Sequence, residues 1–218
     1  MIENCEELLR LERNPRINEL SLKLLQNFYE RYASAFIWQY TLEAECGLQQ
    51  EIELRCGKEQ FCHLLGIEKI AKRHVSSREI RFFRGQQGWS SVRSGQLDMR
   101  SLRALDGQAF RSGKEKFVFF YLLPRILEKP EVVIYDPSKV EPPTNIASSL
   151  LFYDAGQSAY VHLGLDTDDA GFYVPHSFFV EKVTDKHDGQ RFVGRQVKVT
   201  AVKRSQVILA GWRDKNEN

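Results

Sequence analysis

Residues 173–182 read Tyr-Val-Pro-His-Ser-Phe-Phe-Val-Glu-Lys, the densest run of β-forming and reactive side chains in the chain. Alternation along an extended strand sorts these side chains onto two faces of a sheet. The first face carries Ser177, Phe179 and Glu181, and the second carries His176, Phe178, Val180 and Lys182. The stretch therefore predicts a strand that presents polar groups on both faces.

Short β-forming segments separated by turn residues surround this strand. Those on the carboxyl-terminal side of Pro130 are residues 132–135, 150–153, 160–165, 172–174 and 197–202. Strands at this spacing predict an antiparallel β-meander. Nearer the amino terminus, residues 36–42 and 51–55 flank Gly47 and predict a β-hairpin.

The remaining segments carry helical periodicity. Leucines and aromatic residues recur near period 3.6 over residues 6–33, where Pro15 interrupts the pattern. Residues 58–66 predict a short helix that ends at Gly66, and residues 116–123 predict a buried helix. We therefore expect an α+β fold in which helices pack on the meander. The predicted single domain, 1–218, comprises 1–57 (helices and hairpin), 58–130 (basic helical part), 131–205 (meander) and 206–218 (tail).

The composition is that of a soluble globular protein, with 42% apolar and 28% charged residues. No apolar run approaches the roughly 20 residues that span a bilayer. The first residues are acidic, whereas a signal peptide begins with basic residues. We expect a cytoplasmic protein without a membrane partner.

Positive charge is concentrated between Lys69 and Lys116, where twelve Lys and Arg face four Asp and Glu, a net +8. Such a segment suits RNA, because each neutralised phosphate releases counterions. The alternative is that these side chains only solvate helix surfaces. The residues expected to bind RNA are Lys72, Arg73, Arg81 and Arg84, with Tyr173 and Phe179 stacking bases.

The sequence predicts neither a metal site nor a cofactor. Cys46, Cys56, Cys62 and His63 lack the short C-x-x-C spacing of structural zinc sites, so reduced thiols are expected. Phosphate-binding and dinucleotide-binding glycine motifs are absent from the sequence.

Histidines are the candidates for acid–base chemistry, because imidazole titrates near neutral pH. His63 ends a short amphipathic helix, where the alternative is a half-buried structural histidine. His162 alternates with apolar residues and is expected on the open face of the sheet, as a catalytic group or a solvated one. In the 173–182 strand, Ser177 is expected to bind a phosphate oxygen and Lys182 to offset its charge. The alternative is an ordinary strand with one polar edge.

Three segments carry a resemblance to a known family. Residues 61–66 follow F-x-H-L-L-G and precede Ile67, residues 162–165 follow h-L-G-[IL], and residues 173–181 follow y-x-P-x-[ST]-F-f-x-E. These segments resemble signatures of the phage-associated barnase–EndoU–colicin–RelE-like (PBECR) nucleases. The order of helices and then strands also agrees, over about residues 20–203.

The resemblance implies a ribonuclease-like BECR fold found in toxins and mobile elements. Members of the wider fold cleave RNA without a metal: one group takes the proton of the ribose 2′-OH, another protonates the leaving 5′-oxygen, and basic residues stabilise the phosphorane. His63 matches the family's helix histidine and Ser177 its Ser/Thr. Lys182, His176 and His162 are further catalytic candidates from local geometry.

The leading hypothesis is a metal-independent ribonuclease of phage or mobile-element origin. RNA is then the expected partner, with a cognate inhibitor protein as a second, and the sequence leaves the oligomeric state undetermined. A non-catalytic RNA- or protein-binding module on the same fold is the alternative. A third hypothesis is transfer chemistry with a nucleotide cofactor.

Overall fold

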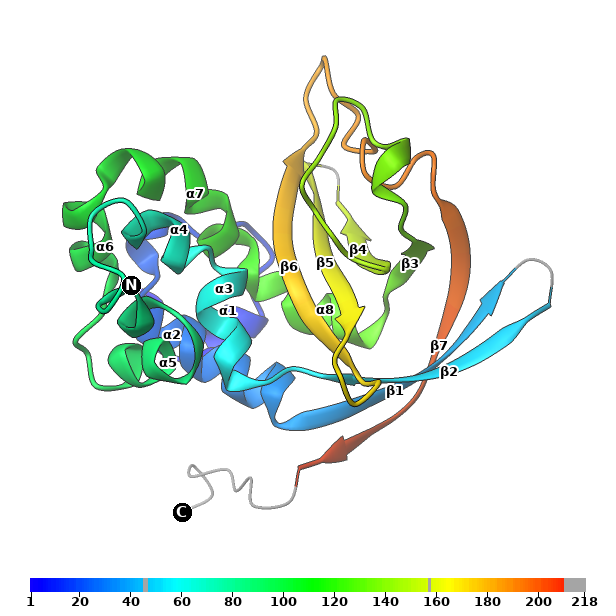
Figure 1. Cartoon of the computed structure of the whole chain (residues 1–218), viewed down its shortest axis with the longest axis horizontal. Helices are drawn as coiled ribbons and strands as arrows, with labels where there is room; N and C mark the ends of the chain where they lie inside the picture. Colours follow the sequence, from blue (N-terminus) through cyan, green and yellow to red (C-terminus); the bar gives the residue numbers. More distant parts are fainter. Residues whose placement is uncertain (45–46, 157, 210–218) are drawn as a thin grey trace. The chain divides into compact units, whose positions relative to one another are not determined.

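The computed structural model describes residues 1–44, 47–156 and 158–209, and its α-helices and β-strands are labelled in Figure 1. The chain divides into two compact units. The first, here the helical unit, comprises Met1–Glu30 and Gly57–Leu122. The second, here the barrel unit, comprises Arg31–Cys56 and Leu123–Asn218. A single domain over residues 1–218 stays a prediction.

Short helices build the helical unit, and Pro15 lies between the first two, as predicted. They are α1 (Cys5–Leu9), η1 (Ile17–Glu19), α2 (Leu22–Tyr29), η3 (Lys58–Gln60), α3 (Phe61–Leu64), α4 (Ile67–Ala71), η4 (Ile80–Phe83), α5 (Gly85–Arg93), α6 (Met99–Leu105), α7 (Gly107–Phe119) and η5 (Phe120–Leu122).

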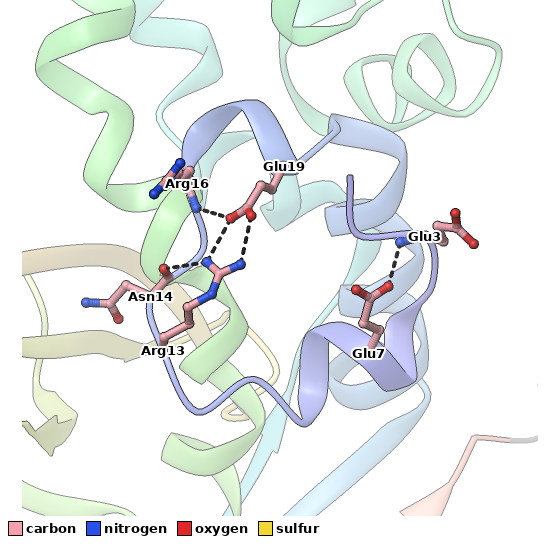
Figure 2. Close-up of polar contacts among 6 residues, drawn as sticks. All are labelled: Glu3, Glu7, Arg13, Asn14, Arg16 and Glu19. Atoms are coloured by element: carbon pink, nitrogen blue, oxygen red, sulfur yellow. Dashed lines mark hydrogen bonds and ion pairs between the residues drawn. The ribbon is translucent and has the colours of Figure 1, made fainter.

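Side-chain contacts hold the amino-terminal segment of this unit (Figure 2). Glu7 accepts a hydrogen bond from the backbone N–H of Glu3 at 2.9 Å. Arg13 donates to both carboxylate oxygens of Glu19, at 2.8 and 2.7 Å, and the N–H of Arg16 donates to the same carboxylate. These hydrogen bonds lower the pKa of the Glu19 carboxyl group to about 2, and the hydrogen bond from Arg13 has the largest effect. These polar contacts add to the burial of Pro15 and Leu20 in stabilising the loop between α1 and α2.

An aromatic cluster forms the core around α3. The Phe61 ring centroid lies 5.4 Å from that of Trp89, 5.7 Å from that of Tyr29 and 5.9 Å from that of Phe120. All four side chains are buried. Because such rings each bury a large apolar area, the cluster fixes α3 in the unit.

The 116–123 run is helical, as predicted, and passes through α7 and η5 into α8 (Leu123–Glu128) of the barrel unit. Phe117, Phe120 and Leu123 on this run are buried. In the barrel unit, the Tyr40 hydroxyl donates to the carbonyl oxygen of Leu127 in α8 at 2.7 Å.

Seven strands close into a barrel in the order β1-β2-β6-β5-β4-β3-β7. The π-helical turn η2 (Glu30–Ser34) precedes them, and η6 (Pro137–Lys139) follows β3. The strands are β1 (Phe36–Ala44), β2 (Gln49–Arg55), β3 (Glu131–Ile134), β4 (Leu150–Ala155), β5 (Ala159–Thr167), β6 (Tyr173–Lys182) and β7 (Val197–Ile208).

The strand pairing corrects the predicted topology. Strands β3 to β6 pair antiparallel in chain order, but β7 pairs with both β3 and β1, and β2 pairs parallel with β6 through Leu54 and Tyr173. The expected antiparallel meander is therefore not confirmed as such. The predicted hairpin, β1 with β2, is confirmed, and it forms part of the closed barrel.

The two faces of the sheet at β4–β6 are both covered. One face carries Phe152, Leu163 and Phe178, which the pairing aligns and which are fully buried. The opposite face carries a second core cluster. Its members are Val133, Tyr135, Val140, Leu151, Tyr153, Phe192 and Val193, with Ile146, Tyr160 and Phe179 packed against it.

Candidate functional site

His63 is exposed on the short helix α3. In α3 the side chains of Phe61, Cys62 and Leu64 are buried, whereas that of His63 is exposed. The N–H of Gly66 donates to the His63 carbonyl oxygen at 2.9 Å, and Gly66 adopts a left-handed φ of 70° that ends the turn. The sequence therefore predicted both the helix and its end, and the structure places the imidazole at the surface of the unit.

The basic residues expected to bind RNA follow His63 in the same unit. The side chains of Lys72, Arg73, Arg81 and Arg84 are all exposed. Arg84 pairs with Glu68 at 3.1 Å, so part of its charge is compensated. The helical unit holds 17 Lys and Arg against 12 Asp and Glu, a formal +5, whereas the barrel unit holds 14 against 17, a formal −3.

Lys116 is a residue that the sequence analysis did not single out. Its Nζ donates to the carbonyl oxygen of Leu64 at 3.2 Å, at the end of α3. Burial, and secondarily the charge of Lys69, lower its pKa to about 8. Lys116 is the first residue of the apolar run 116–123. The sequence contains no local pattern that distinguishes it from a lysine exposed to solvent.

The strand around Ser177 contains a β-bulge that the sequence did not predict. Ser177 pairs with Gly164 and Pro175 pairs with Leu165, so His176 is the extra residue of β6. The prediction that His176 shares a face with Phe178 is therefore wrong, because the bulge breaks the alternation. His176 is exposed.

A small polar niche lies beside Ser177. A Cβ atom on Gly164 would stand 2.2 Å from Ser177 Oγ and 2.4 Å from Ser148 Oγ, so any other residue there would displace these hydroxyls. Both hydroxyls are buried and have no hydrogen-bond partner among the described residues. Ser148 is a second hydroxyl that sequence reasoning missed, because it lies far from Ser177 along the chain.

His162 does not lie on an open face, and that expectation is corrected. Its side chain is 0% exposed, because the second core cluster covers this face of the sheet. The imidazole stacks on Phe179, with ring centroids 4.5 Å apart, and lies near the rings of Phe192, Tyr153 and Tyr160. An aromatic cage of this kind excludes solvent from both ring nitrogens.

The same environment decides the protonation of His162. Burial lowers its pKa to about 3, so the imidazole is neutral at neutral pH. Glu181 Oε2 lies 4.0 Å from His162 Nε2, and burial raises the pKa of this carboxyl group. In the described part of the chain, no hydrogen-bond partner is present for either ring nitrogen of His162 or for Glu181 Oε2. The contact is therefore not an ion pair at neutral pH.

A cleft of about 1110 Å³ opens in the barrel unit. Its walls are residues 179–182 of β6, the loop from Lys139 to Ile146 and the loop from Thr184 to Arg195. Phe179 and Lys182, both predicted site residues, line it, as does Glu181. Tyr173 is half-buried at the start of β6, where it pairs with Leu54 and Thr167.

The structure thus sorts the predicted site residues between the units. His63 and the four basic residues belong to the helical unit. The barrel unit holds His162, Ser177, Phe179 and Glu181 on one face of β5 and β6, with Lys182 at the end of β6. Glu181 closes the 173–181 signature, so the sequence did contain a signal for it.

Metal ligands do not gather in the part of the chain that the structure describes, where no group of three or more His, Cys, Asp or Glu is placed to hold an ion. Cys46 lies outside the described residues. Cys56 and Cys62 are buried thiols, and burial raises the pKa of Cys62 to about 12. Within the same described residues, no helix has the length and apolar character needed to cross a bilayer.

Comparison with protein-family models identifies a family. No curated protein and no solved structure is significantly similar to the chain. The family model described as phage-Barnase-EndoU-ColicinE5/D-RelE like nuclease4 (PBECR4) matches residues 25–209. That span includes α3 with His63 and all seven strands. The chain belongs to this family of phage-associated nuclease-like proteins.

Proposed function

We propose that the protein is a metal-independent ribonuclease of phage or mobile-element origin. The family match supports a nuclease, and the basic helical unit supports a polyanionic substrate. The observation that carries the proposal is His63: an exposed imidazole, held by buried neighbours, in the unit that bears the excess positive charge.

The reaction proposed is transesterification at the phosphodiester. The ribose 2′-oxygen loses its proton to a base and attacks phosphorus, and the 5′-oxygen takes a proton from an acid as the P–O bond breaks. His63 carries the proton at one of these two steps. Within the barrel unit, Ser177 is the candidate donor to a phosphate oxygen, and because its Oγ is buried this contact requires the niche beside Gly164 to open on binding. Lys182 and His176 are the candidates in that unit for offsetting the phosphate charge.

The basic residues have a separate role in this proposal. Lys72, Arg73, Arg81 and Arg84 bind backbone phosphates and so supply affinity without sequence preference. A cognate inhibitor protein and a cytoplasmic location remain predictions.

The experiment incubates purified full-length protein with total RNA and with tRNA, in EDTA, beside two histidine variants. His63→Ala is expected to lower the cleavage rate by about 10²- to 10⁴-fold, the usual contribution of a general acid or base. His74→Ala is the matched control, since His74 is an exposed histidine of the same unit that pairs with Asp106. Cleavage that survives in His63→Ala, or that stops in EDTA for the wild type, contradicts the proposal.

A second candidate function, an RNA-binding module without catalysis, is favoured by one observation. Burial of His162 removes a candidate proton carrier, because a neutral imidazole with a pKa of about 3 and no solvent access does not exchange protons with a substrate. Salt-sensitive RNA binding with intact RNA in every lane would support this function over cleavage.

A further inference from the structure

We propose that one face of the barrel sheet contains a covered binding site for a ribose–phosphate unit of RNA, formed by His162, Glu181, Ser177 and Ser148 and closed by the loop 184–195. The inference rests on the proposed function, because it assigns these side chains to the same substrate. It goes beyond that function in two respects. It gives the buried histidine and the carboxyl group a ligand, and it makes the loop a movable cover.

The strand register places the polar groups of β5 and β6 on one face of the sheet. Ser177 lies opposite Gly164, and the next position of β5 on that face is His162, which lies opposite Phe179. Glu181 is two residues beyond Phe179 and therefore shares the face. Two residues of a strand span about 7 Å, so the serine and the histidine stand about that far apart along the strands.

Two hydroxyl groups converge at the serine end of this row. A Cβ atom on Gly164 would stand 2.2 Å from Ser177 Oγ and 2.4 Å from Ser148 Oγ. Both oxygens are buried, and neither has a hydrogen-bond partner within the described ranges. Two neighbouring O–H donors suit the non-bridging oxygens of a phosphodiester, which only accept hydrogen bonds.

An imidazole and a carboxyl group meet at the other end. His162 Nε2 lies 4.0 Å from Glu181 Oε2, a separation too long for a hydrogen bond. A backbone hydrogen bond from Arg191 holds the Glu181 carboxyl group, but Oε2 and both ring nitrogens have no partner among the residues described. Native proteins pair nearly all buried polar groups, so unpaired ones call for an explanation. A ribose 2′-hydroxyl, which donates one hydrogen bond and accepts another, can satisfy both groups.

The loop 184–195 covers this face through a small apolar contact. Its buried apolar side chains are Phe192 and Val193, and the Phe192 ring centroid lies 4.7 Å from that of Phe179. Residues 184–188 are exposed. The cleft of about 1110 Å³ runs along this loop and already reaches Phe179. Displacement of the Phe192 ring would therefore connect the cleft to the polar groups behind it.

Two arginines hold the cover to the loop that contains Glu141. Arg191 Nε donates to the carbonyl oxygen of Glu141 at 3.2 Å, and Arg191 Nη2 donates to that of Pro142. Arg195 pairs with the Glu141 carboxylate at 3.1 Å, and these two side chains are 65% and 73% exposed. Exposed ion pairs contribute little to stability, so the cover can open locally while the sheet stays folded.

The first experiment measures access to the covered face by thiol labelling of the full-length protein. Ser148→Cys should react at least about 10-fold faster than global unfolding allows, and Arg191→Ala should raise that rate by about 10-fold again. Ala159→Cys is the matched control, since Ala159 is buried on the opposite face of β5. The unsubstituted protein gives the background from the native thiols. Equal labelling of the two cysteine variants, with and without Arg191→Ala, overturns the cover.

The second experiment measures discrimination between RNA and DNA, in a His63→Ala background so that the RNA stays intact. An RNA oligonucleotide should bind about 3- to 10-fold more tightly than DNA of the same sequence, because only RNA offers the 2′-hydroxyl. His162→Phe and Glu181→Gln should each abolish this preference, whereas Ser177→Ala should weaken binding of both nucleic acids alike. His74→Ala, at an exposed histidine of the helical unit, should keep the preference.

The results separate this inference from the proposed function. A parent protein without RNA preference, or a preference that survives in both His162→Phe and Glu181→Gln, overturns the covered site. Preference that depends on these side chains, in a wild-type protein that cleaves no RNA, keeps the site and removes the ribonuclease. Cleavage by the wild type, with Ser148→Cys labelled only at the rate of global unfolding, does the reverse.

Discussion

The helical unit and the barrel unit each contain a histidine that the sequence marks as a candidate, and the two side chains have opposite environments. His63 is exposed in a unit of charge +5. His162 is fully buried in a unit of charge −3, and its pKa is lowered to about 3. The difference shows that residue type and local motif do not determine which histidine can exchange protons, because burial decides it.

The largest effect is expected from removing the aromatic core that holds His63 in place. Phe61→Ala should lower the free energy of unfolding by about 3–5 kcal/mol, since Phe61 is fully buried among Tyr29, Trp89 and Phe120. Urea denaturation measures this loss. Phe82→Ala, at a side chain 43% exposed, is the control and should cost under about 0.5 kcal/mol.

A loss below about 1 kcal/mol in Phe61→Ala would show that the cluster does not hold the helical unit together. Hydrogen exchange in the same variant tests the single-domain prediction. If the chain is a single domain, Phe61→Ala should lower the protection of backbone amides from hydrogen exchange in residues 57–122 and in residues 123–182 alike.

The next effect is an acid sensitivity specific to the barrel unit. The unfolded chain protonates His162 near pH 6.5, whereas the folded chain does so only near pH 3. The unfolded state therefore binds more protons in this window, and stability falls as the pH drops through it, by up to about 1.4 kcal/mol per pH unit.

His162→Phe should remove this contribution, measured as the free energy of unfolding at pH 7.5, 5.5 and 4.5. The raised pKa of Glu181 acts in the opposite direction, and because Glu181 Oε2 lies 4.0 Å from His162 Nε2, the comparison is made with Glu181→Gln present in both proteins. His74→Ala should keep the acid sensitivity of the wild type. An unchanged slope in His162→Phe would mean that the imidazole has a polar partner or access to solvent.

A buried charge in the helical unit gives a smaller effect. The pKa of Lys116 is about 8 in the folded chain and 10.5 ordinarily, so the charged form costs stability below pH 8. Lys116→Met should therefore raise the free energy of unfolding at pH 7 by about 1–2 kcal/mol, after allowance for partial exposure. The gain should shrink between pH 8 and 10.5.

Thermal and urea denaturation at pH 7 and pH 10 measure this change. Lys114→Met, at a lysine side chain 51% exposed, should have little effect at either pH. If Lys116→Met is less stable at pH 7, the hydrogen bond to the Leu64 carbonyl outweighs the cost of burial.

The charge difference between the units predicts where RNA binds. Lys72→Gln and Arg73→Gln should each reduce the slope of log affinity against log salt by about one phosphate contact. Lys198→Gln, in the barrel unit, should leave the slope unchanged. Fluorescence anisotropy with a single-stranded RNA between 50 and 200 mM salt is the measurement. An equal change in the salt slope for all three variants would mean that the helical unit does not bind RNA in preference to the barrel unit.

The smallest effect on stability is expected at Ser177. Its buried Oγ has no partner among the described residues, so Ser177→Ala should raise the free energy of unfolding, by up to about 1 kcal/mol. Ser21→Ala is the matched control. Ser21 Oγ caps α2 by accepting from the Leu24 N–H, and its loss should cost about 1 kcal/mol.

The rate of RNA cleavage should distinguish the two serine variants in the opposite order to their stability. Ser177→Ala should lower it by about 10-fold if the hydroxyl binds a phosphate oxygen, whereas Ser21→Ala should not. A Ser177→Ala protein that cleaves RNA at the wild-type rate would make this hydroxyl a structural residue.

Local sequence determined the elements of the fold. Buried positions at helical spacing and a terminal Gly66 predicted α3, and alternation with flanking turns predicted the strands. These features depend on side chains a few residues apart, so a single segment contains the information. The family signatures are local in the same sense, which is why the sequence alone supported the PBECR assignment.

Only the tertiary structure decided how the strands close and which candidates are accessible. Pairing of β7 with both β1 and β3 turns an expected meander into a barrel, and the bulge at His176 redirects one candidate. Residues 135–140 and 192–193 cover the face that holds His162. Burial and strand register depend on contacts between segments tens of residues apart, and a local pattern contains no information about them.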